Sequence, residues 1–480
     1  MRHSFVFFFL ALCLVSLHVV ADGVSRHRAI ILTDVENEPD DAQSLVRLLL
    51  YSDVIDLRGI VATTSTHMRD RVAPETIHKT IDAYAAVRPN LLLHSGSYPT
   101  SEFLHSIVKA GLPRYGMEAV GKGFNSEGSE LIVNELLSPD DRPLWVCAWG
   151  GTNVLAQALF YLRGSLSPSK LSSAIAKLRV YTISDQDDSG IWIRKNFPSL
   201  FYIVSPGGYG NAEWGGMNET APGADNDVVS NKWVAENVQV GHGPLGACYP
   251  DVAYGMEGDT PSFLSLIPNG LNDPEHPEYG GWGGRYELYK PRREDCDPDG
   301  FNGNVPVEDE PHAIYTNAVD SFHPFKPNNF GPAILPDTTL CRGFKATIWR
   351  WRTEFQNDFA ARLDWCVAPY DKANHAPVAT LDHSNELTVK SGEKFLLSAE
   401  NCSDPDGDNI SFLWLFYPEA GSYRGDNVRF LCAQNIHHAY VQAPVVDHPS
   451  TLHFILKVTD KGSPALSSYQ RVIVTILPLG

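Results

Sequence analysis

The sequence predicts an α/β domain built on a mostly parallel sheet with long loops, followed by a C-terminal all-β sandwich. Continuous apolar runs such as residues 29–32 are typical of strands that helices cover on both faces. These runs alternate with helical patterns, which favours parallel strands. Short strands of alternating polarity then follow a linker at residues 368–377. We therefore expect the α/β domain to span residues 22–370 and the sandwich to span residues 371–480.

The expected elements of the α/β domain follow one another in a regular order. A helix should begin at Asp40 and Asp41, because apolar residues then recur at helical spacing. Residues 205–340 are rich in Gly, Pro, Trp and Asn, which predicts long loops of the kind that build binding sites. A closing helix is expected near residues 344–359. The other expected strands are at residues 57–62, 144–148, 179–183 and 201–204, and the other helices at residues 74–87, 127–137 and 152–162.

The C-terminal domain should be a sandwich of about 100 residues. Its strands are expected at residues 386–389, 394–398, 410–415, 452–458 and 470–476. The run Asp404-Pro-Asp406-Gly-Asp408 has two interpretations: closely spaced acids in such a turn could chelate Ca²⁺, or they form a plain β-turn. We favour the plain turn.

Composition limits the partners of this chain. Its 480 residues include 57 Asp and Glu against 38 Lys and Arg, a formal net charge of −19. A chain without a net cationic field is a poor partner for a nucleic acid, so none is expected. A small ligand, a neutral polysaccharide or a divalent metal remains compatible with this charge.

Residues 1–21 have the pattern of a secretory signal peptide. A short basic start precedes the apolar run of residues 5–15, and small residues stand before Asp22. The alternative is an uncleaved anchor, although His18 interrupts the apolar run. We expect cleavage, and therefore a secreted, extracellular protein that is not held in a membrane. Seven cysteines remain after the signal, an odd number, so at least one thiol should stay free; Cys147, in an apolar strand, is the first candidate.

A dense acidic run follows the first expected strand and leads into the first helix. Ligands bind beyond the carboxyl ends of parallel strands, so these side chains should face the binding crevice. Carboxylates this close repel one another, and a hard cation with oxygen ligands, Ca²⁺ most naturally, resolves that repulsion. The alternative is that the last two acids only complement the helix dipole. The five acids are Asp34, Glu36, Glu38, Asp40 and Asp41.

A second acidic run, residues 184–190, follows a later strand. Asp185 and Asp188 are our candidates for binding substrate hydroxyls, since charged acceptors bind hydroxyl donors strongly. The alternative is that these residues cap the following helix.

The Gly-rich loops offer further ligand contacts. Asn211, Glu213 and Trp214 have the side chains that sugar recognition uses, and Trp282 adds another aromatic face. The alternative is that such Trp residues anchor their loops. His242 and His276 are further candidates for protonating a leaving group, although neither stands out among 17 His.

Several stretches resemble a known family. The run from Thr33 to Ala42 is similar to the D-x-D-x-G-x-D-D-A signature of inosine/uridine nucleoside hydrolases. The closer resemblance is to the secreted cellulose-binding-protein family with a nucleoside hydrolase-like domain and a C-terminal cadherin/Ig-like β-sandwich. The matching stretches are LTDVENEPDDAQSLVRLLLYS, IVATTSTH, YTISDQDDSGIWIR and NGLNDPEHPEYGGWGGRY.

The resemblance implies roles for individual residues. Asp34 would be the catalytic general base and a metal ligand, Asp40 a substrate contact, and Asp41 a bidentate metal ligand. Thr152 would offer its backbone carbonyl to calcium, and Asp259 would complete the metal site. The sequence departs from the signature in two ways: Leu32 replaces its first Asp, and the spacing from Asp34 to Asp40 is longer.

Together these features predict a secreted, calcium-dependent hydrolase acting on N-glycosyl, nucleoside-like bonds or related glycosidic bonds. The Ca²⁺ ion and Asp34 would activate a water molecule for attack on an anomeric carbon. The alternative is a non-catalytic secreted protein that binds a carbohydrate such as a cellulose-like polysaccharide. A third possibility is an adhesion module that works through the sandwich alone.

Overall fold

The structure is a computed structural model that describes residues 26–207, 209–211, 213–296, 304–305, 307–327, 334–336, 338–425 and 428–479. The expected signal peptide, residues 1–21, lies outside the described residues. Within the described part of the chain, no helix has the length and apolarity needed to cross a membrane.

An eight-stranded sheet forms the centre of the first domain, as expected, with strand order β3-β2-β1-β4-β5-β6-β8-β7. Neighbouring strands are parallel except for the pair β7 and β8. The strands are β1 (His27–Thr33), β2 (Ile55–Ala62), β3 (Val108–Ala110), β4 (Leu144–Ala148), β5 (Leu178–Thr182), β6 (Phe201–Ile203), β7 (Tyr286–Tyr289) and β8 (Ile314–Asn317).

Helices cover both faces of this sheet, which explains the continuous apolar runs of its central strands. Alternate residues of β1 enter different cores: Ala29 and Ile31 pack with α1 and α2, whereas Ile30 and Leu32 pack with α4 and α5. The helices are α1 (Pro39–Leu50), α2 (Pro74–His94), α3 (Ser101–Ser106), α4 (Glu127–Leu137), α5 (Asn153–Ser165), α6 (Pro168–Lys177) and α7 (Ser189–Asn196).

The region expected to consist of long loops contains short elements as well. Several of these elements are a single turn long, so no periodic pattern in the sequence indicates them. They are α8 (Glu213–Asn218), α9 (Asn231–Val234), α10 (Gly243–Ala247), α11 (Pro261–Leu264), β9 (Asp320–Phe322), β10 (Phe325–Pro327), β11 (Ile334–Pro336) and β12 (Cys341–Gly343). The closing helix is divided into α12 (Ala346–Trp349) and α13 (Arg352–Asp364).

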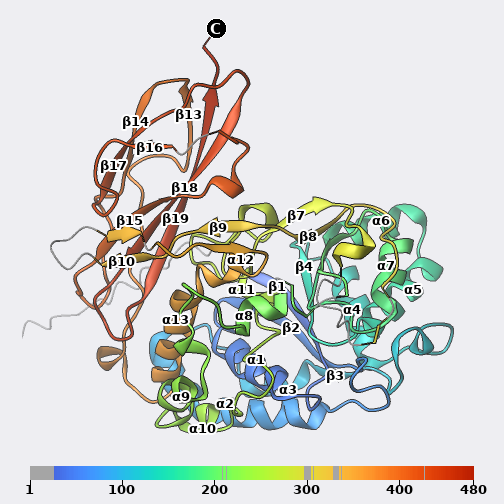
Figure 1. The fold of residues 1–480 in the computed structure, drawn as a ribbon. Helices are drawn as coiled ribbons and strands as arrows, with labels where there is room; N and C mark the ends of the chain where they lie inside the picture. Colours follow the sequence, from blue (N-terminus) through green and yellow to red (C-terminus); the bar gives the residue numbers. More distant parts are fainter. Residues whose placement is uncertain are drawn as a thin grey trace, which may run out of the picture.

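The C-terminal domain contains two sheets that share one apolar core. One sheet has the order β13-β19-β18-β15 and the other β14-β17-β16. Figure 1 shows this domain, in orange to red, standing beside the α/β domain. The strands are β13 (Glu386–Lys390), β14 (Lys394–Ser398), β15 (Ser411–Phe416), β16 (Arg429–Phe430), β17 (His438–Gln442), β18 (Ser450–Thr459) and β19 (Ser467–Leu477).

The two domains are joined through buried side chains. Trp282 of the α/β domain is buried against Tyr469 of β19, so it anchors the junction and offers no free face to a sugar. The buried Asp320 carboxylate accepts hydrogen bonds from Arg285 (2.7 Å), Arg350 (2.8 Å) and the hydroxyl of Tyr417 (2.6 Å) in the C-terminal domain. These contacts fix the sandwich against the first domain.

Free thiols are present at Cys147, Cys248, Cys366, Cys402 and Cys432. Cys147 is fully buried in β4, and burial raises the pKa of its thiol to about 12. A thiol with so high a pKa is almost entirely protonated at neutral pH and is a poor nucleophile.

Candidate active site

The strands of the main sheet place acidic and small residues at one edge. Asp34 follows β1, residues 63–66 follow β2, residues 150–152 follow β4 and residues 184–188 follow β5. Because the carboxyl ends of parallel strands meet at the same edge of a sheet, these segments come together there. Asp40 and Asp41 lie in the first turn of α1, where the helix dipole favours negative charge.

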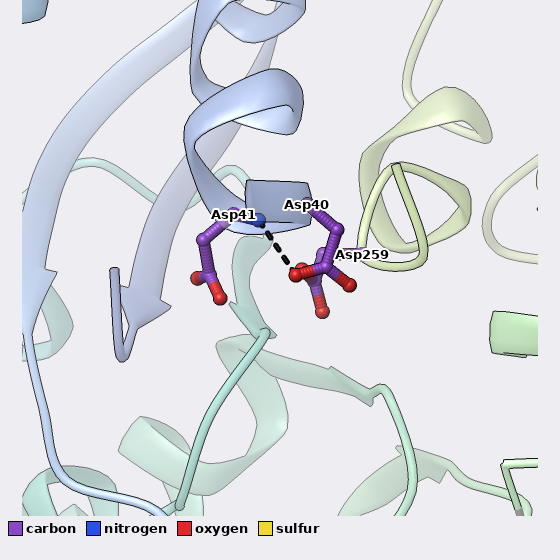
Figure 2. Close-up of side chains that lie close together, drawn as sticks. All are labelled: Asp40, Asp41 and Asp259. Atoms are coloured by element: carbon purple, nitrogen blue, oxygen red, sulfur yellow. Dashed lines mark hydrogen bonds between the residues drawn. The ribbon is translucent and has the colours of Figure 1, made fainter. Parts of the chain in front are cut away.

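Three carboxylates converge most closely at this edge. Asp40, Asp41 and Asp259 each offer an oxygen, and these oxygens lie within 4.8 Å of one another. Figure 2 shows the two α1 side chains beside Asp259, which comes from the turn before α11. All three are at most 3% exposed, and none forms an ion pair within the described part of the chain.

The hydrogen bonds of the cluster leave acceptor atoms unused. The hydroxyl of Thr33 donates to Asp41, and the backbone N–H of Asp41 donates to Asp40 (2.9 Å). The indole N–H of Trp214 donates to the other oxygen of Asp40 (3.1 Å). One buried oxygen of Asp259 has no hydrogen-bond partner among the described residues, and the same holds for one buried oxygen of Asp34. Buried carboxylate oxygens without donors suit a hard cation.

The cluster holds more negative charge than its surroundings stabilise. Burial raises the pKa of Asp34 to about 7 and that of Asp40 to about 6. Burial and the charges of Asp40 and Asp34 raise the pKa of Glu38 to about 8. Burial, followed by the neighbouring carboxylates, also raises the pKa values of Asp41 and Asp259 well above their usual range. Without a cation, these groups cannot all be ionised at neutral pH.

Asp34 lies beside the three carboxylates, against a tight turn. A Cβ atom on Gly150 would lie only 2.6 Å from the Asp34 carboxylate, so glycine gives the space that this side chain occupies. Its hydrogen bond with Ser65 lowers the Asp34 pKa but does not outweigh burial. Asp34 is therefore a carboxyl group poised to gain or lose a proton near neutral pH.

Thr152, the remaining expected metal ligand, is engaged by neighbours. Its hydroxyl is 2.7 Å from that of Ser189, and its carbonyl accepts the backbone N–H of Ala156 (2.9 Å). It lies beside the buried Asp187, a residue that the sequence analysis did not select. Burial raises the pKa of Asp187 to about 6.

The second acidic run is largely neutralised by protein groups. Arg194 of α7 donates to both oxygens of Asp185, at 2.9 and 2.6 Å, and also pairs with Glu310 (2.7 Å). Asp188 is exposed and accepts the backbone N–H of Met117 (2.8 Å). Asp187 accepts the backbone N–H groups of residues 153 and 189. The two candidates for binding hydroxyls thus have partners within the protein.

A pocket of about 590 Å³ opens beside the first acidic cluster. Glu38 and Trp214 belong to both the pocket wall and the surroundings of the cluster, since Trp214 also bonds Asp40. Aromatic side chains form much of the wall, which suits the faces of sugar rings or of a nucleobase. The pocket is lined by Asn37, Glu38, His67, Tyr209, Gly210, Trp214, Glu219 and Tyr254.

Asn211 and Glu213 are buried close in sequence to the pocket residue Trp214. Each is only 1% exposed, and their side-chain oxygen and nitrogen atoms have no hydrogen-bond partners among the described residues. Burial raises the pKa of Glu213 to about 7, and Ser205 partly opposes this. Buried polar groups without partners are costly unless a ligand or water satisfies them.

The two histidines considered from the sequence lie elsewhere. His242 bonds the carboxylate of Asp364 (3.1 Å), and His276 bonds that of Glu278 (3.1 Å). Neither lines the pocket, whereas His67 does and is 3.1 Å from the hydroxyl of Tyr209. The sequence signal for His67 was its place just after the second strand.

The fold and this edge of the sheet define a nucleoside hydrolase-like protein. Residues 28–286 match the family described as cellulose-binding Sde182, nucleoside hydrolase-like domain, and residues 394–476 match the C-terminal domain of cellulose-binding protein Sde0182. The chain belongs to this cellulose-binding Sde182 family. The likeness of its C-terminal domain to cadherin and Ig domains stays a prediction.

A solved structure is similar to this protein over most of the chain. It is described as a nucleoside hydrolase-related hypothetical protein from Saccharophagus degradans that is associated with carbohydrate metabolism. The two are 35% identical, with 94% of this chain and 100% of the other covered and a TM-score of 0.76. The fold class expected from the sequence is thereby confirmed.

Two other solved structures are much less similar. The PKD domain of the KIAA 1837 protein is 22% identical over 22% of this chain and 92% of its own, with a TM-score of 0.16. The type III effector XopQ, complexed with adenosine diphosphate ribose, is 11% identical over 52% of this chain and 69% of its own, with a TM-score of 0.29. Comparison with curated proteins gave no significant match.

Proposed function

We propose that this protein is a secreted, calcium-dependent hydrolase that cleaves an N-glycosyl or related glycosidic bond of a sugar-containing ligand. One observation carries the proposal: buried carboxylates without a cationic partner converge beside an aromatic pocket. The family's cellulose-binding description and the relative's association with carbohydrate metabolism support a carbohydrate ligand.

The donor set fits calcium. Asp40, Asp41 and Asp259 would hold the ion, and the unused oxygens of Asp259 and Asp34 give it further hard ligands. When bound, the ion would supply positive charge that stabilises the ionised acids and lowers the pKa of a nearby water.

The chain's own residues account for the rest of the chemistry. Asp34, a buried carboxylate beside the three that would hold the ion, would take a proton from the attacking water. Trp214 and Tyr209 would stack on the ligand's rings, and Asn37, Glu38 and Glu219 on the same wall would hold hydroxyl groups. Asn211 and Glu213 are buried and do not line this wall, so they would contact hydroxyl groups only if a ligand reached beyond it. His67 lines the same pocket, but burial lowers its pKa, so at neutral pH its neutral imidazole would offer a leaving group a hydrogen bond and not a proton. Bond cleavage would proceed through an oxocarbenium-like transition state.

A second candidate function is carbohydrate binding without turnover. Both carboxylate oxygens of Asp40, the expected sugar contact, already accept hydrogen bonds, from Trp214 and from the backbone of Asp41. This observation favours the second function. Asp185 is similarly occupied by Arg194. In that case, the pocket would hold a glycan through its aromatic wall alone.

The deciding experiment measures release of free base or reducing sugar from a panel of nucleosides and aryl glycosides, with calcium and with a chelator. The wild type should turn over at least one class of substrate, and Asp34→Asn should lower kcat by roughly 100-fold or more, as expected on removal of a general base. Asp141→Asn, at a side chain that is 95% exposed, is the matched control. Undiminished turnover by Asp34→Asn would reject the mechanism, and ligand binding without turnover by the wild type would establish the second function.

A further inference from the structure

A polar groove of about 410 Å³ lies between the two domains, away from the acidic pocket. His27, at the start of β1, lines this groove, whereas Asp34 follows the other end of the same strand. The groove is therefore near the amino ends of the strands and the candidate active site near their carboxyl ends. Its second wall is made by residues 385–386 and 470–473 of the C-terminal domain.

The walls of this groove are held in place by the domain junction. The backbone N–H of Tyr469 donates to the carbonyl of Asn269 (2.9 Å), and the Tyr469 ring packs against Trp282. Arg471 donates to the carbonyls of Leu271 (2.9 Å) and Gly280 (2.6 Å). A ligand entering here would meet a site that is already formed, which lowers the entropic cost of binding.

Polar groups on both walls lack partners. Arg471 is 9% exposed and lines the groove, and its buried Nε–H has no acceptor among the described residues. One buried oxygen of Glu275 has no donor. Asp273 and Glu386 also line the groove, and their carboxylates accept no hydrogen bond from the described part of the chain. A buried donor without an acceptor is rare in proteins and indicates that a ligand or water completes it.

The chemistry of these groups selects the ligand. Hydroxyl groups both donate and accept, so a sugar can satisfy the Arg471 N–H and the carboxylates together. Burial lowers the pKa of His27, so its imidazole adds no positive charge at neutral pH. Three carboxylates line the walls against the Arg471 guanidinium, and Arg179 pairs with one of them, Glu275 (2.8 Å), so the walls keep a small net negative charge that disfavours anions. Tyr279, stacked on His276 with ring centres 4.5 Å apart, adds an aromatic face to the wall.

We propose that this groove between the domains binds a neutral oligosaccharide, as a second carbohydrate site separate from the acidic pocket. The α/β domain supplies Asp273 and the aromatic face, and the sandwich supplies Asn385 and Glu386. The sandwich thus forms half of a binding site, and the bound glycan lies across both domains.

The test uses the full-length protein and isothermal titration with two neutral probes, cellohexaose and mannohexaose, and one anionic probe, hexagalacturonate. At least one neutral probe should bind, and the anionic probe should bind more weakly. The Asn385→Ala/Glu386→Ala double variant and Asp273→Ala should each weaken neutral binding roughly tenfold or more, the loss expected from hydrogen bonds to charged and amide groups. Asp447→Ala, at a side chain that is 93% exposed in the same domain, is the matched control.

The Trp214→Ala variant distinguishes ligand binding in this groove from ligand binding in the acidic pocket. Neutral binding that survives Trp214→Ala but falls in the groove variants supports the proposal. The proposal is overturned if both groove variants keep the wild-type affinity or if only Trp214→Ala loses binding. It is also overturned if the anionic probe binds as tightly as the neutral probes, or if neither neutral probe binds. The outcome is independent of the hydrolase proposal, because turnover of a small nucleoside by the groove variants is measured separately and should stay at the wild-type rate.

Discussion

The acidic run after β1 and the acidic run after β5 are similar in composition but lie in different surroundings. In the second, Arg194 pairs with Asp185 and a backbone N–H donates to Asp188, whereas the buried Asp187 has hydrogen bonds but no ion pair within the described part of the chain, and burial raises its pKa. In the first, no ion pair balances Asp34, Asp40 or Asp41 within the described part of the chain, and burial raises their pKa values. The comparison shows that the number of acids after a strand is not enough to choose a metal site. We propose the first run as the calcium site because Asp34, Asp40 and Asp41 have no counter-charge among the described residues.

The largest effect should come from removing the counter-charge of the second run. Arg194→Met would leave Asp185 and Glu310 without their partner, so the free energy of unfolding should fall by about 3–5 kcal/mol. Chemical denaturation measures this change. Arg163→Met, at an exposed arginine, is the control and should change stability by less than about 1 kcal/mol. Equal losses in the two variants would mean that the second run needs no internal cation.

The first run should respond to pH and calcium instead. An acid whose pKa is raised by folding binds more protons in the folded state, so the shifts of Asp34 and Asp40 make stability fall as pH rises from about 4 to about 7. Calcium should offset this loss, and its stabilisation should therefore be larger at pH 8 than at pH 5. Thermal unfolding with calcium and with chelator at the two pH values measures the difference. In Asp41→Asn, both the pH slope and the calcium effect should shrink; a calcium effect independent of pH would contradict this account.

The smallest effect is expected at Asp188, where the side chain is exposed and its partner is a single backbone N–H. Asp188→Asn keeps an acceptor there, so stability should change by less than about 0.5 kcal/mol. Ligand affinity should also stay constant, in contrast to our sequence-based assignment of Asp188 as a substrate contact. Titration with any ligand found in the turnover panel tests this directly, and a large loss of affinity would restore the original assignment.

Much of the fold could be predicted because burial on both faces gives long apolar strands a clear signal. The strands from β1 to β6 that were expected fall close to their observed positions, and α2 begins at Pro74 as expected. The same helix continues through Pro89 to His94, beyond its expected end at residue 87. Strands β7 and β8 were missed: they are short, and β7 is exposed along most of its length.

The candidate site was predictable only in part. The run from Asp34 to Asp41 is local in sequence, so its convergence with the strand ends follows from the fold class. Asp259 was expected only from the family resemblance, and the pocket residue Tyr254 was not expected. Both come from an irregular region more than 200 positions away, where no periodicity indicates which side chains face inward. The neutralisation of Asp185 depends on Glu310 and Arg194 meeting in space, which spacing along the chain does not show.

The apolar core beneath the sheet does not stop at the domain boundary: Tyr417, Ile455 and Tyr469 of the C-terminal domain belong to the same cluster as Ile31 and Trp351. Cutting the chain at the linker would therefore expose apolar surface on each fragment. We expect that neither fragment is stable as a soluble monomer. On heating, the two domains of the whole protein should unfold in one cooperative transition. The C-terminal domain is therefore expected to be part of one rigid unit with the α/β domain, and not an independent domain on a flexible linker.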